Sequence, residues 1–139
     1  MSGINQVTQR AIWKFGTNWD GNENSFYEFI RDRNLVIGTS DEVPYRPNDI
    51  VLIASGFTVR ALARVENTPR SITERPDLAS RLVQFGIPQD EVRVTFADAM
   101  WIELKDNEQF RYLCQQGAVR VHHAQTLAMV ESLIKEKNL

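Results

Sequence analysis

Three tryptophans carry the most chemical information in this sequence. Trp13 lies near the end of a first apolar stretch, Trp19 lies in a polar, glycine-flanked loop, and Trp101 falls on the polar side of a later stretch. Aromatic faces beside a polar loop can stack a flat, partly polar group such as a nucleobase, because every base offers a π-face and hydrogen-bonding edges. Thr17 and Asn18 could bind such an edge, although an Asx-turn explains Asn18 equally well. Core packing is the competing explanation, and it is strongest for Trp13.

Arginines gather in the middle of the chain and are candidates for phosphate contacts. The stretch from Arg46 to Arg81 holds six arginines against four acids, whereas the stretch from Asp20 to Glu42 holds six acids against two arginines. We therefore expect one side of the folded molecule to be positive and able to contact a phosphate backbone. Pairing of these arginines with nearby acids is the alternative. The candidate phosphate ligands are Arg46, Arg60, Arg64 and Arg70.

The sequence offers little support for catalysis. It contains no phosphate-binding glycine loop and no pair of histidines at helical spacing. His122 and His123 are adjacent, so in a strand they face opposite ways and cannot chelate one metal ion together. Cys114 has no second cysteine beside it and is expected to be a buried, inert thiol. We predict a non-enzymatic protein without metal or cofactor; a small hydrolase or nuclease that uses either histidine is the weakest alternative.

Length and composition set the class of protein. The chain has 139 residues, of which 42% are hydrophobic and 24% charged, and its net charge is −2. A domain of this size buries roughly 68% of the surface of its unfolded chain, so it needs no disulfide to fold. No apolar run approaches the ~20 residues of a membrane span, and the polar start has no signal core. The sequence predicts one cytoplasmic domain over residues 1–139, and its acidic balance argues against a surface that coats duplex nucleic acid.

A central hairpin is the strongest structural signal. The run from Ile50 to Ile53 is continuously aliphatic, which is typical of a strand covered on both faces. Ser55-Gly56 then predicts a turn, and the period becomes two from Phe57 to Val65. We expect one face of this second strand to pack in the core and the other to carry two arginines. The predicted core face holds Phe57, Val59, Ala61, Ala63 and Val65, and the opposite face holds Thr58, Arg60, Leu62 and Arg64.

Periodicity and capping signals predict the other elements. We expect strands at Arg10–Phe15, Leu35–Gly38 and Ala118–His122, and helices that start at a capping box on Ser25, at Pro76 and before Leu127. The stretch Glu91–Leu104 predicts two strands, or one strand bent at Asp98–Ala99, with Trp101 on its polar face. Asp106 is expected to cap a short helix that contains Phe110, Leu113 and Cys114 and ends at Gly117.

The order of these elements resembles the PUA-like superfamily, and in particular its EVE and YTH domains. The resemblance spans nearly the whole chain and rests on short, mainly hydrophobic motifs. It implies an α+β fold with a partly open β-barrel of about five to six mixed strands and flanking helices. The matching pieces are the strand that ends in the loop Gly16–Trp19, the LVIG strand Leu35–Gly38, the connection Arg46–Asp49, the hairpin Ile50–Val65 and the MWIEL segment Met100–Leu104.

The resemblance also implies a pocket for a modified or flipped nucleobase. In such domains the pocket is formed by the end of the first strand, the loop after it and the strand after the first helix, which correspond here to Lys14–Trp19 and Ile37–Thr39. YTH domains carry a tryptophan at about the position of Ile37, so Trp19 or Trp101 would supply the missing ring. The candidate base-pocket residues are Trp13, Lys14, Gly16, Thr17, Asn18, Trp19, Ile37, Gly38, Thr39 and Trp101.

We therefore predict a domain that binds DNA or RNA and recognises a nucleobase, with protein partners as a further option. The alternative is a protein-interaction or regulatory domain on the same barrel. Such a domain would use the acidic stretch from Asp20 to Glu42 or the closing helix, and its binding would be insensitive to salt.

Overall fold

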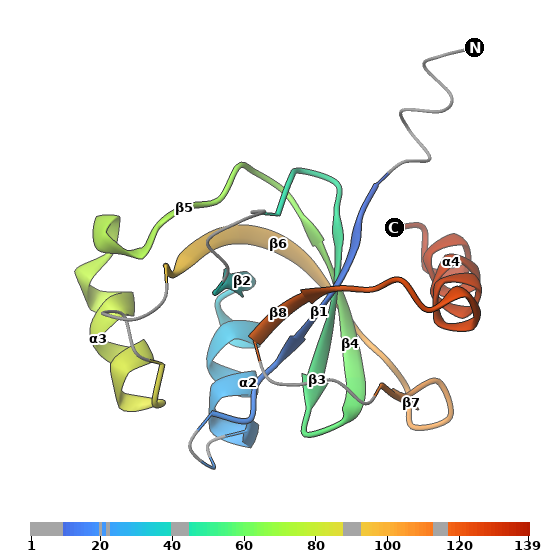
Figure 1. Cartoon of the computed structure of the whole chain (residues 1–139), viewed down its shortest axis with the longest axis horizontal. Helices are drawn as coiled ribbons and strands as arrows, with labels where there is room; N and C mark the ends of the chain where they lie inside the picture. Colours follow the sequence, from blue (N-terminus) through green and yellow to red (C-terminus); the bar gives the residue numbers. More distant parts are fainter. Residues whose placement is uncertain (1–9, 20, 22, 40–44, 88–92, 113–116) are drawn as a thin grey trace.

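A computed structural model describes residues 10–19, 21, 23–39, 45–87, 93–112 and 117–139 of the chain (Figure 1). Strands and helices are mixed along this part of the sequence. In chain order the elements are β1 (Ile12–Gly16), α2 (Glu23–Asp32), β2 (Leu35–Gly38), β3 (Ile50–Ser55), β4 (Thr58–Val65), β5 (Arg70–Ser71), the 3-10 helix η1 (Ile72–Glu74), α3 (Pro76–Gln84), β6 (Thr95–Glu103), β7 (Phe110–Arg111), β8 (Gly117–Arg120) and α4 (Ala124–Lys137).

The described strands form one sheet that curls into an open half-barrel (Figure 1). Its eight strands follow the order β2-β6-β4-β3-β1-β8, with β5 beside β6 and β7 beside β4. β1 runs parallel to β3, whereas the other pairs are antiparallel. Because the sheet curls, its end strands β2 and β8 come into contact. The prediction of a mixed α+β fold with a partly open barrel is confirmed, with two short strands beyond the expected number. None of the described helices is long and apolar enough to span a membrane.

Apolar side chains cover both faces of the sheet and form two cores. The inner core lies within the curl and joins α2 and α3 to one face of the sheet. The outer core lies between the opposite face and α4. Strand alternation decides which core a residue joins: Val51 and Ile53 point inward, whereas Ile50 and Leu52 point outward. The prediction that Ile50–Ile53 is covered on both faces is confirmed.

A β-bulge in the hairpin changes the predicted alternation. Ile53 pairs with Ala61, but the next residue, Ala54, pairs with Val59, so Arg60 is an extra residue in β4. The bulge rotates the strand, and Val59 therefore joins the outer core instead of sharing the inner face with Ala61. The predicted assignment of Val59 is wrong for this reason.

The remaining faces of β4 also differ from the prediction. Leu62, expected on the polar face, is fully buried in the outer core, because α4 covers this side of the sheet. Phe57, expected in the core, precedes β4 at the hairpin turn and is 49% exposed. Both faces of the hairpin are thus apolar along most of its length.

β6 is one strand that changes partners where the sequence predicts a bend. It pairs with β2 up to Asp98 and with β4 from Ala99 onward. The alternation does not persist along the strand, because Phe96 and Ala97 both lie in the inner core. As a result Trp101 packs against the inner core, and its predicted place on the polar face is wrong.

The helix boundaries are mostly as predicted. α3 starts at Pro76 and is followed by Gly86, whose positive φ of 94° ends the helix. α2 begins at Glu23, so Ser25 lies in its first turn and is not the N-cap.

The helix predicted after Asp106 is wrong in its described part. Residues 106–108 form a turn, and Phe110–Arg111 form the strand β7. β7 pairs with Thr58 and Val59, the end of β4 that β6 leaves free. Long-range strand pairing thus overrides the local helix signal. The predictions for Leu113 and Cys114, and those for Asp20, Asp41 and Glu42, lie outside the described residues.

α4 is fixed at both ends. His123 is its N-cap, and the ring Nδ1 accepts a hydrogen bond from the backbone N–H of Thr126. Near the other end, Lys137 Nζ donates to Glu108 Oε2 over 2.6 Å, and both side chains are more than four-fifths buried. Glu108 Oε1 also accepts from the backbone N–H of Lys105. This carboxylate therefore ties α4 to the turn after β6.

The Glu108 pair should make stability depend on pH. The bond from Lys137 holds the pKa of Glu108 below its usual value. Since the pKa is lower in the folded than in the unfolded chain, the pair stabilises the fold above the usual glutamate pKa. This contribution is lost as the pH falls through the lowered value. Glu108→Gln should therefore lower the unfolding free energy at neutral pH and flatten the acid side of its pH dependence, measured by urea denaturation.

A matched control is Glu131→Gln, since Glu131 is an exposed acid of α4, the helix that carries Lys137. This variant should keep the pH dependence of the wild type. Equal slopes on the acid side for Glu108→Gln and the wild type would contradict the assignment.

Candidate functional site

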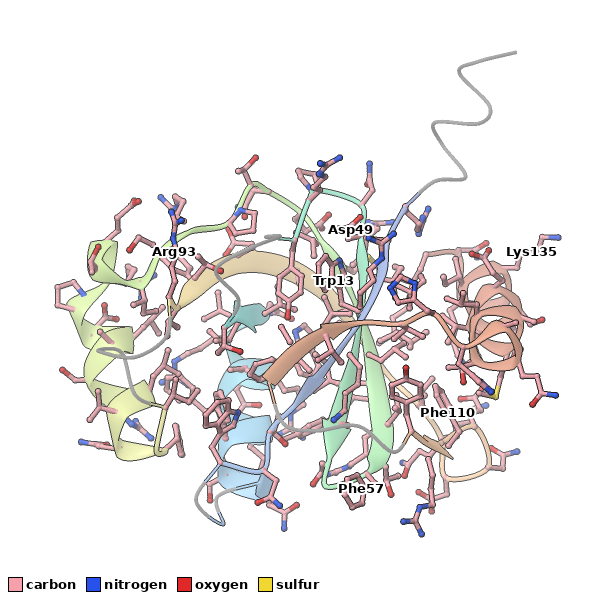
Figure 2. The ribbon with its side chains drawn as sticks, in the orientation of Figure 1. Trp13, Asp49, Phe57, Arg93, Phe110 and Lys135 are labelled. Carbon is pink, nitrogen blue, oxygen red and sulfur yellow. The ribbon has the colours of Figure 1, made fainter. Side chains whose placement is uncertain are left out.

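A buried carboxylate next to β3 organises the best candidate site. Asp49 is 4% exposed. Its Oδ1 accepts a hydrogen bond from the backbone N–H of Ala11 over 3.0 Å. Its Oδ2 accepts from the indole Nε1 of Trp13 and from the backbone N–H of Arg46, both over 3.0 Å (Figure 2). Three N–H donors offset the cost of burying the charge and fix the plane of the indole ring.

Tyr45 completes an aromatic pair with Trp13. The two rings meet edge-on, with centroids 5.4 Å apart and planes at 77°. The Tyr45 hydroxyl donates to the carbonyl of Ile37 over 2.8 Å, and burial raises the pKa of Tyr45, which keeps this donor protonated. A Cβ on Gly38 would lie 2.7 Å from Oγ1 of Thr95 and 3.5 Å from the Tyr45 ring. An added side chain would therefore collide with Thr95 on the neighbouring strand β6, whereas its contact with the Tyr45 ring would be of ordinary van der Waals length.

The two end strands of the half-barrel meet beside this pair. The backbone N–H of Ala118 in β8 donates over 3.2 Å to Oγ1 of Thr39, which follows β2. Trp13 pairs with Arg120 across β1 and β8. The guanidinium of Arg120 lies over the Trp13 ring, 5.6 Å from its centroid. We call this group the seam site; its residues are Trp13, Gly38, Thr39, Tyr45 and Arg120.

The loop after β1 is held tightly against the hairpin. The backbone N–H and the hydroxyl of Thr17 both donate to the carbonyl of Ala54 over 2.9 Å. Trp19 is only 9% exposed, packs in the inner core and donates through Nε1 to the carbonyl of Gly16. The loop therefore does not present this indole to solvent as its polar sequence suggests. Asn18 is exposed and free of that packing.

Other predicted base-pocket residues are distributed around β1 and β2. Gly16 pairs with Gly117 and so lies along the same β1–β8 edge as Trp13. Ile37 is buried in the inner core behind the seam site. Lys14 is 1% exposed, and strand alternation places it on the outer face of β1, away from the seam site.

Trp101 belongs to a second aromatic cluster. Its Nε1 donates to the carbonyl of Leu35 over 2.9 Å, and its ring meets Tyr27 edge-on at 5.6 Å. The bulge residue Arg60 lies over the Tyr27 ring at 4.2 Å, and the Tyr27 hydroxyl donates to Glu103. Burial, together with the Glu103 carboxylate, raises the pKa of Tyr27 to about 12.

The two clusters lie at opposite ends of one cross-strand row on the inner face. Trp13 pairs with Val51, Val51 with Ala63, and Ala63 with Trp101. Two small or branched residues therefore separate the two tryptophans along the sheet.

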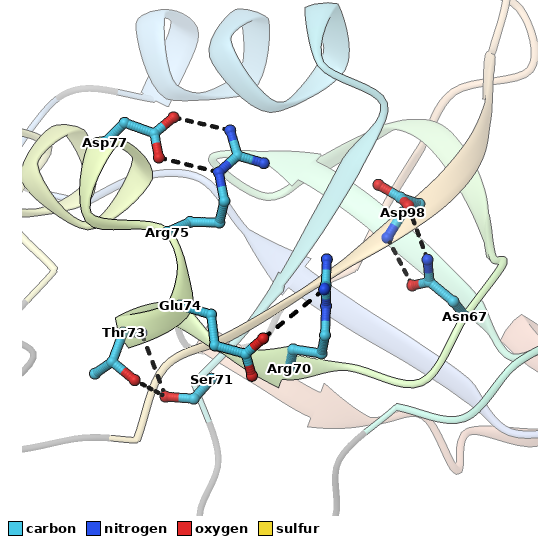
Figure 3. A network of polar contacts seen from close by, with 8 residues as sticks. All are labelled: Asn67, Arg70, Ser71, Thr73, Glu74, Arg75, Asp77 and Asp98. Atoms are coloured by element: carbon cyan, nitrogen blue, oxygen red, sulfur yellow. Dashed lines mark hydrogen bonds and ion pairs between the residues drawn. The ribbon is translucent and has the colours of Figure 1, made fainter.

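The four predicted phosphate ligands do not gather on one face. Arg46 is exposed and borders the seam site through its bond to Asp49. Arg64 lies on the outer face, with Nη2 3.7 Å from Glu66. Arg70 pairs with Glu74 at 3.8 Å, as Figure 3 shows. Arg60 belongs to the second aromatic cluster described above. Of the four, Arg46 is thus the one best placed for a ligand at the seam site.

Sequence reasoning did not assign Tyr45 or Arg120 to the site. The residues around Arg120 in the sequence predict a strand but do not predict that Arg120 lies next to Trp13, because Trp13 is far away in the chain. Asp49 offers a clearer signal, since an acid directly before a wholly apolar strand needs buried donors. Tyr45 follows a stretch of turn-forming residues and gives no periodic pattern.

Neither a metal centre nor a known relative identifies the site. Among the described residues, no group of three His, Cys, Asp or Glu side chains could hold a metal ion. Comparisons of the chain with known protein families, with curated proteins and with solved structures found no match. The function must therefore be inferred from the seam site itself.

Asp49 should be essential for the stability of this region. Asp49→Ala leaves the buried indole N–H of Trp13 without an acceptor, which costs ~1–3 kcal/mol, and removes the acceptor of the part-buried backbone N–H groups of Ala11 and Arg46. We expect the unfolding free energy to fall by ~1–3 kcal/mol or more, measured by urea denaturation. Asp49→Asn keeps one carbonyl oxygen and should cost less.

The control is Asp32→Ala, because Asp32 is exposed and, within the part of the chain that the structure describes, forms an ion pair only with its neighbour Arg31. It should change stability by less than ~1 kcal/mol. A loss of the same size in Asp49→Ala and Asp32→Ala would show that the carboxylate is not what holds the site.

Proposed function

We propose that this half-barrel is a PUA-like domain that binds a nucleic acid in the cytoplasm and takes one nucleobase, modified or flipped out of its stack, at the seam site. It recognises the base without catalysing a reaction. The observation that carries the proposal is the Trp13–Tyr45 pair directly beneath the two end strands of the sheet. The element order that resembles EVE and YTH domains supports the same conclusion.

The seam site offers the two kinds of contact that a base requires. The indole of Trp13 provides a π-face that is held in a fixed plane by Asp49. The Thr39 hydroxyl, whose oxygen accepts from the backbone N–H of Ala118, can donate its proton to an acceptor on a base edge.

The energies are consistent with a flipped base. Removing a base from its stack costs a few kcal/mol, and stacking on an aromatic side chain returns ~1–3 kcal/mol. The difference must come from hydrogen bonds and phosphate contacts. Arg46 is exposed beside the site and is the candidate for a phosphate contact.

Replacement of Arg46 tests the proposal. Arg46→Gln should weaken the binding of labelled single-stranded DNA or RNA, measured by fluorescence anisotropy at several salt concentrations. Loss of one phosphate contact should reduce the slope of log K against log salt by about 0.7. The bond between the Arg46 backbone and Asp49 does not involve the side chain, so the fold should be retained.

Arg75→Gln is the control, because Arg75 is exposed and forms a bidentate ion pair with Asp77 at the start of α3 (Figure 3). It should leave the salt slope unchanged. If the wild type binds neither DNA nor RNA in any salt condition, the proposed function is wrong.

A further inference from the structure

The seam site already contains a cation. Arg120 is exposed on the end strand β8, and its guanidinium lies 5.6 Å from the centroid of the Trp13 ring. A guanidinium is planar and carries a delocalised positive charge, so it suits the negative face of an indole. The site therefore accommodates a flat cation in the conformation observed.

The surroundings of Trp13 strengthen its attraction for positive charge. Its Nε1 donates to Oδ2 of Asp49, and donation to an anion increases the electron density of the ring. Asp49 and Trp13 are both almost fully buried, so the interaction acts where water screens it weakly. These features favour a cationic group over a neutral one on the face of this indole.

Arg120 can leave the ring at low cost. Its side chain is exposed, and among the described residues it forms no ion pair within 4.0 Å. Its backbone is held by pairing of β8 with β1, so the side chain can move while the strand stays in place. A ligand with the same planar, cationic character can therefore replace it.

We infer that the seam site selects a nucleobase with a delocalised positive charge, as results from methylation of a ring nitrogen, and that Arg120 occupies the place of this base in the free protein. The inference rests on the proposed function and specifies its ligand. In 1-methyladenine and 3-methylcytosine the methyl group is on a ring nitrogen, and both bases are cationic near neutral pH. Their isomers N6-methyladenine and 5-methylcytosine are neutral.

The isomers provide a sharp test, because each pair has the same number of methyl groups and differs in charge. Single-stranded oligonucleotides with one modified base are titrated against the wild-type protein near neutral pH, with fluorescence anisotropy as the readout. We expect binding of the cationic isomer to be roughly threefold to thirtyfold tighter, the range that one cation–π contact provides. An unmodified oligonucleotide serves as the reference.

Two variants assign the preference to the site. Arg120→Gln removes a positive charge beside the bound base. This charge repels the cationic isomer and not the neutral one, so the variant should increase the ratio of their affinities. Trp13→Phe keeps a ring but weakens its negative face, so it should reduce this ratio. Trp101→Phe is the matched control, because Trp101 also loses one indole hydrogen bond but lies in the other cluster; it should keep the ratio of the wild type.

The outcomes separate the inference from the proposed function. Equal affinities for cationic and neutral isomers would overturn the inference while leaving nucleobase binding in place. A preference that persists in Trp13→Phe and disappears in Trp101→Phe would also overturn it, since the ligand would then bind at the second cluster. Absence of binding to all oligonucleotides would refute the proposed function itself. Thermal unfolding of each variant confirms that the comparison uses folded protein.

Discussion

The bonds of one carboxylate determine the geometry of the whole candidate site. β1 and β3 are parallel neighbours, so no short turn can set their register. Their register is set by two hydrogen bonds to Ala11. The Asp49 carboxylate accepts from the backbone N–H of Ala11, and the backbone N–H of Ile50 donates to the carbonyl of Ala11. These two bonds join the starts of both strands, and the other two donors to the Asp49 carboxylate, the Trp13 indole and the Arg46 backbone, are positioned by the same group. The position of the Trp13–Tyr45 pair thus depends on the buried carboxylate of Asp49.

Much of the fold could be predicted from local patterns. The strand Leu35–Gly38, the central hairpin, the proline at the start of α3 and the change of partner at Asp98–Ala99 all follow from residue period and turn signals. The errors share a cause, because they depend on distant parts of the chain. The bulge at Arg60, the pairing of β7 with β4 and the cover that α4 gives to Leu62 are set by tertiary contacts that no local window contains.

The site was less predictable than the fold for a related reason. The sequence identifies tryptophans as interesting residues but does not show which way each indole points. Trp19 and Trp101 both become packing residues whose N–H groups bind backbone carbonyls. Trp13 is also buried, but it lies beside the end strand β8 and under the guanidinium of Arg120. Its neighbours Tyr45 and Arg120 come from separate parts of the chain, so their meeting is a property of the curled sheet.

The pairing of β1 with β8 has a consequence for synthesis of the protein. β1 leaves the ribosome long before β8, and the segments between them contribute most of the other strands. Throughout this interval β1 has one backbone edge without its final partner, a state in which nascent chains tend to aggregate or recruit chaperones. Contacts between such distant segments also form slowly. The edge of β1 that faces β8 is therefore the last edge within the sheet that can gain its partner during synthesis.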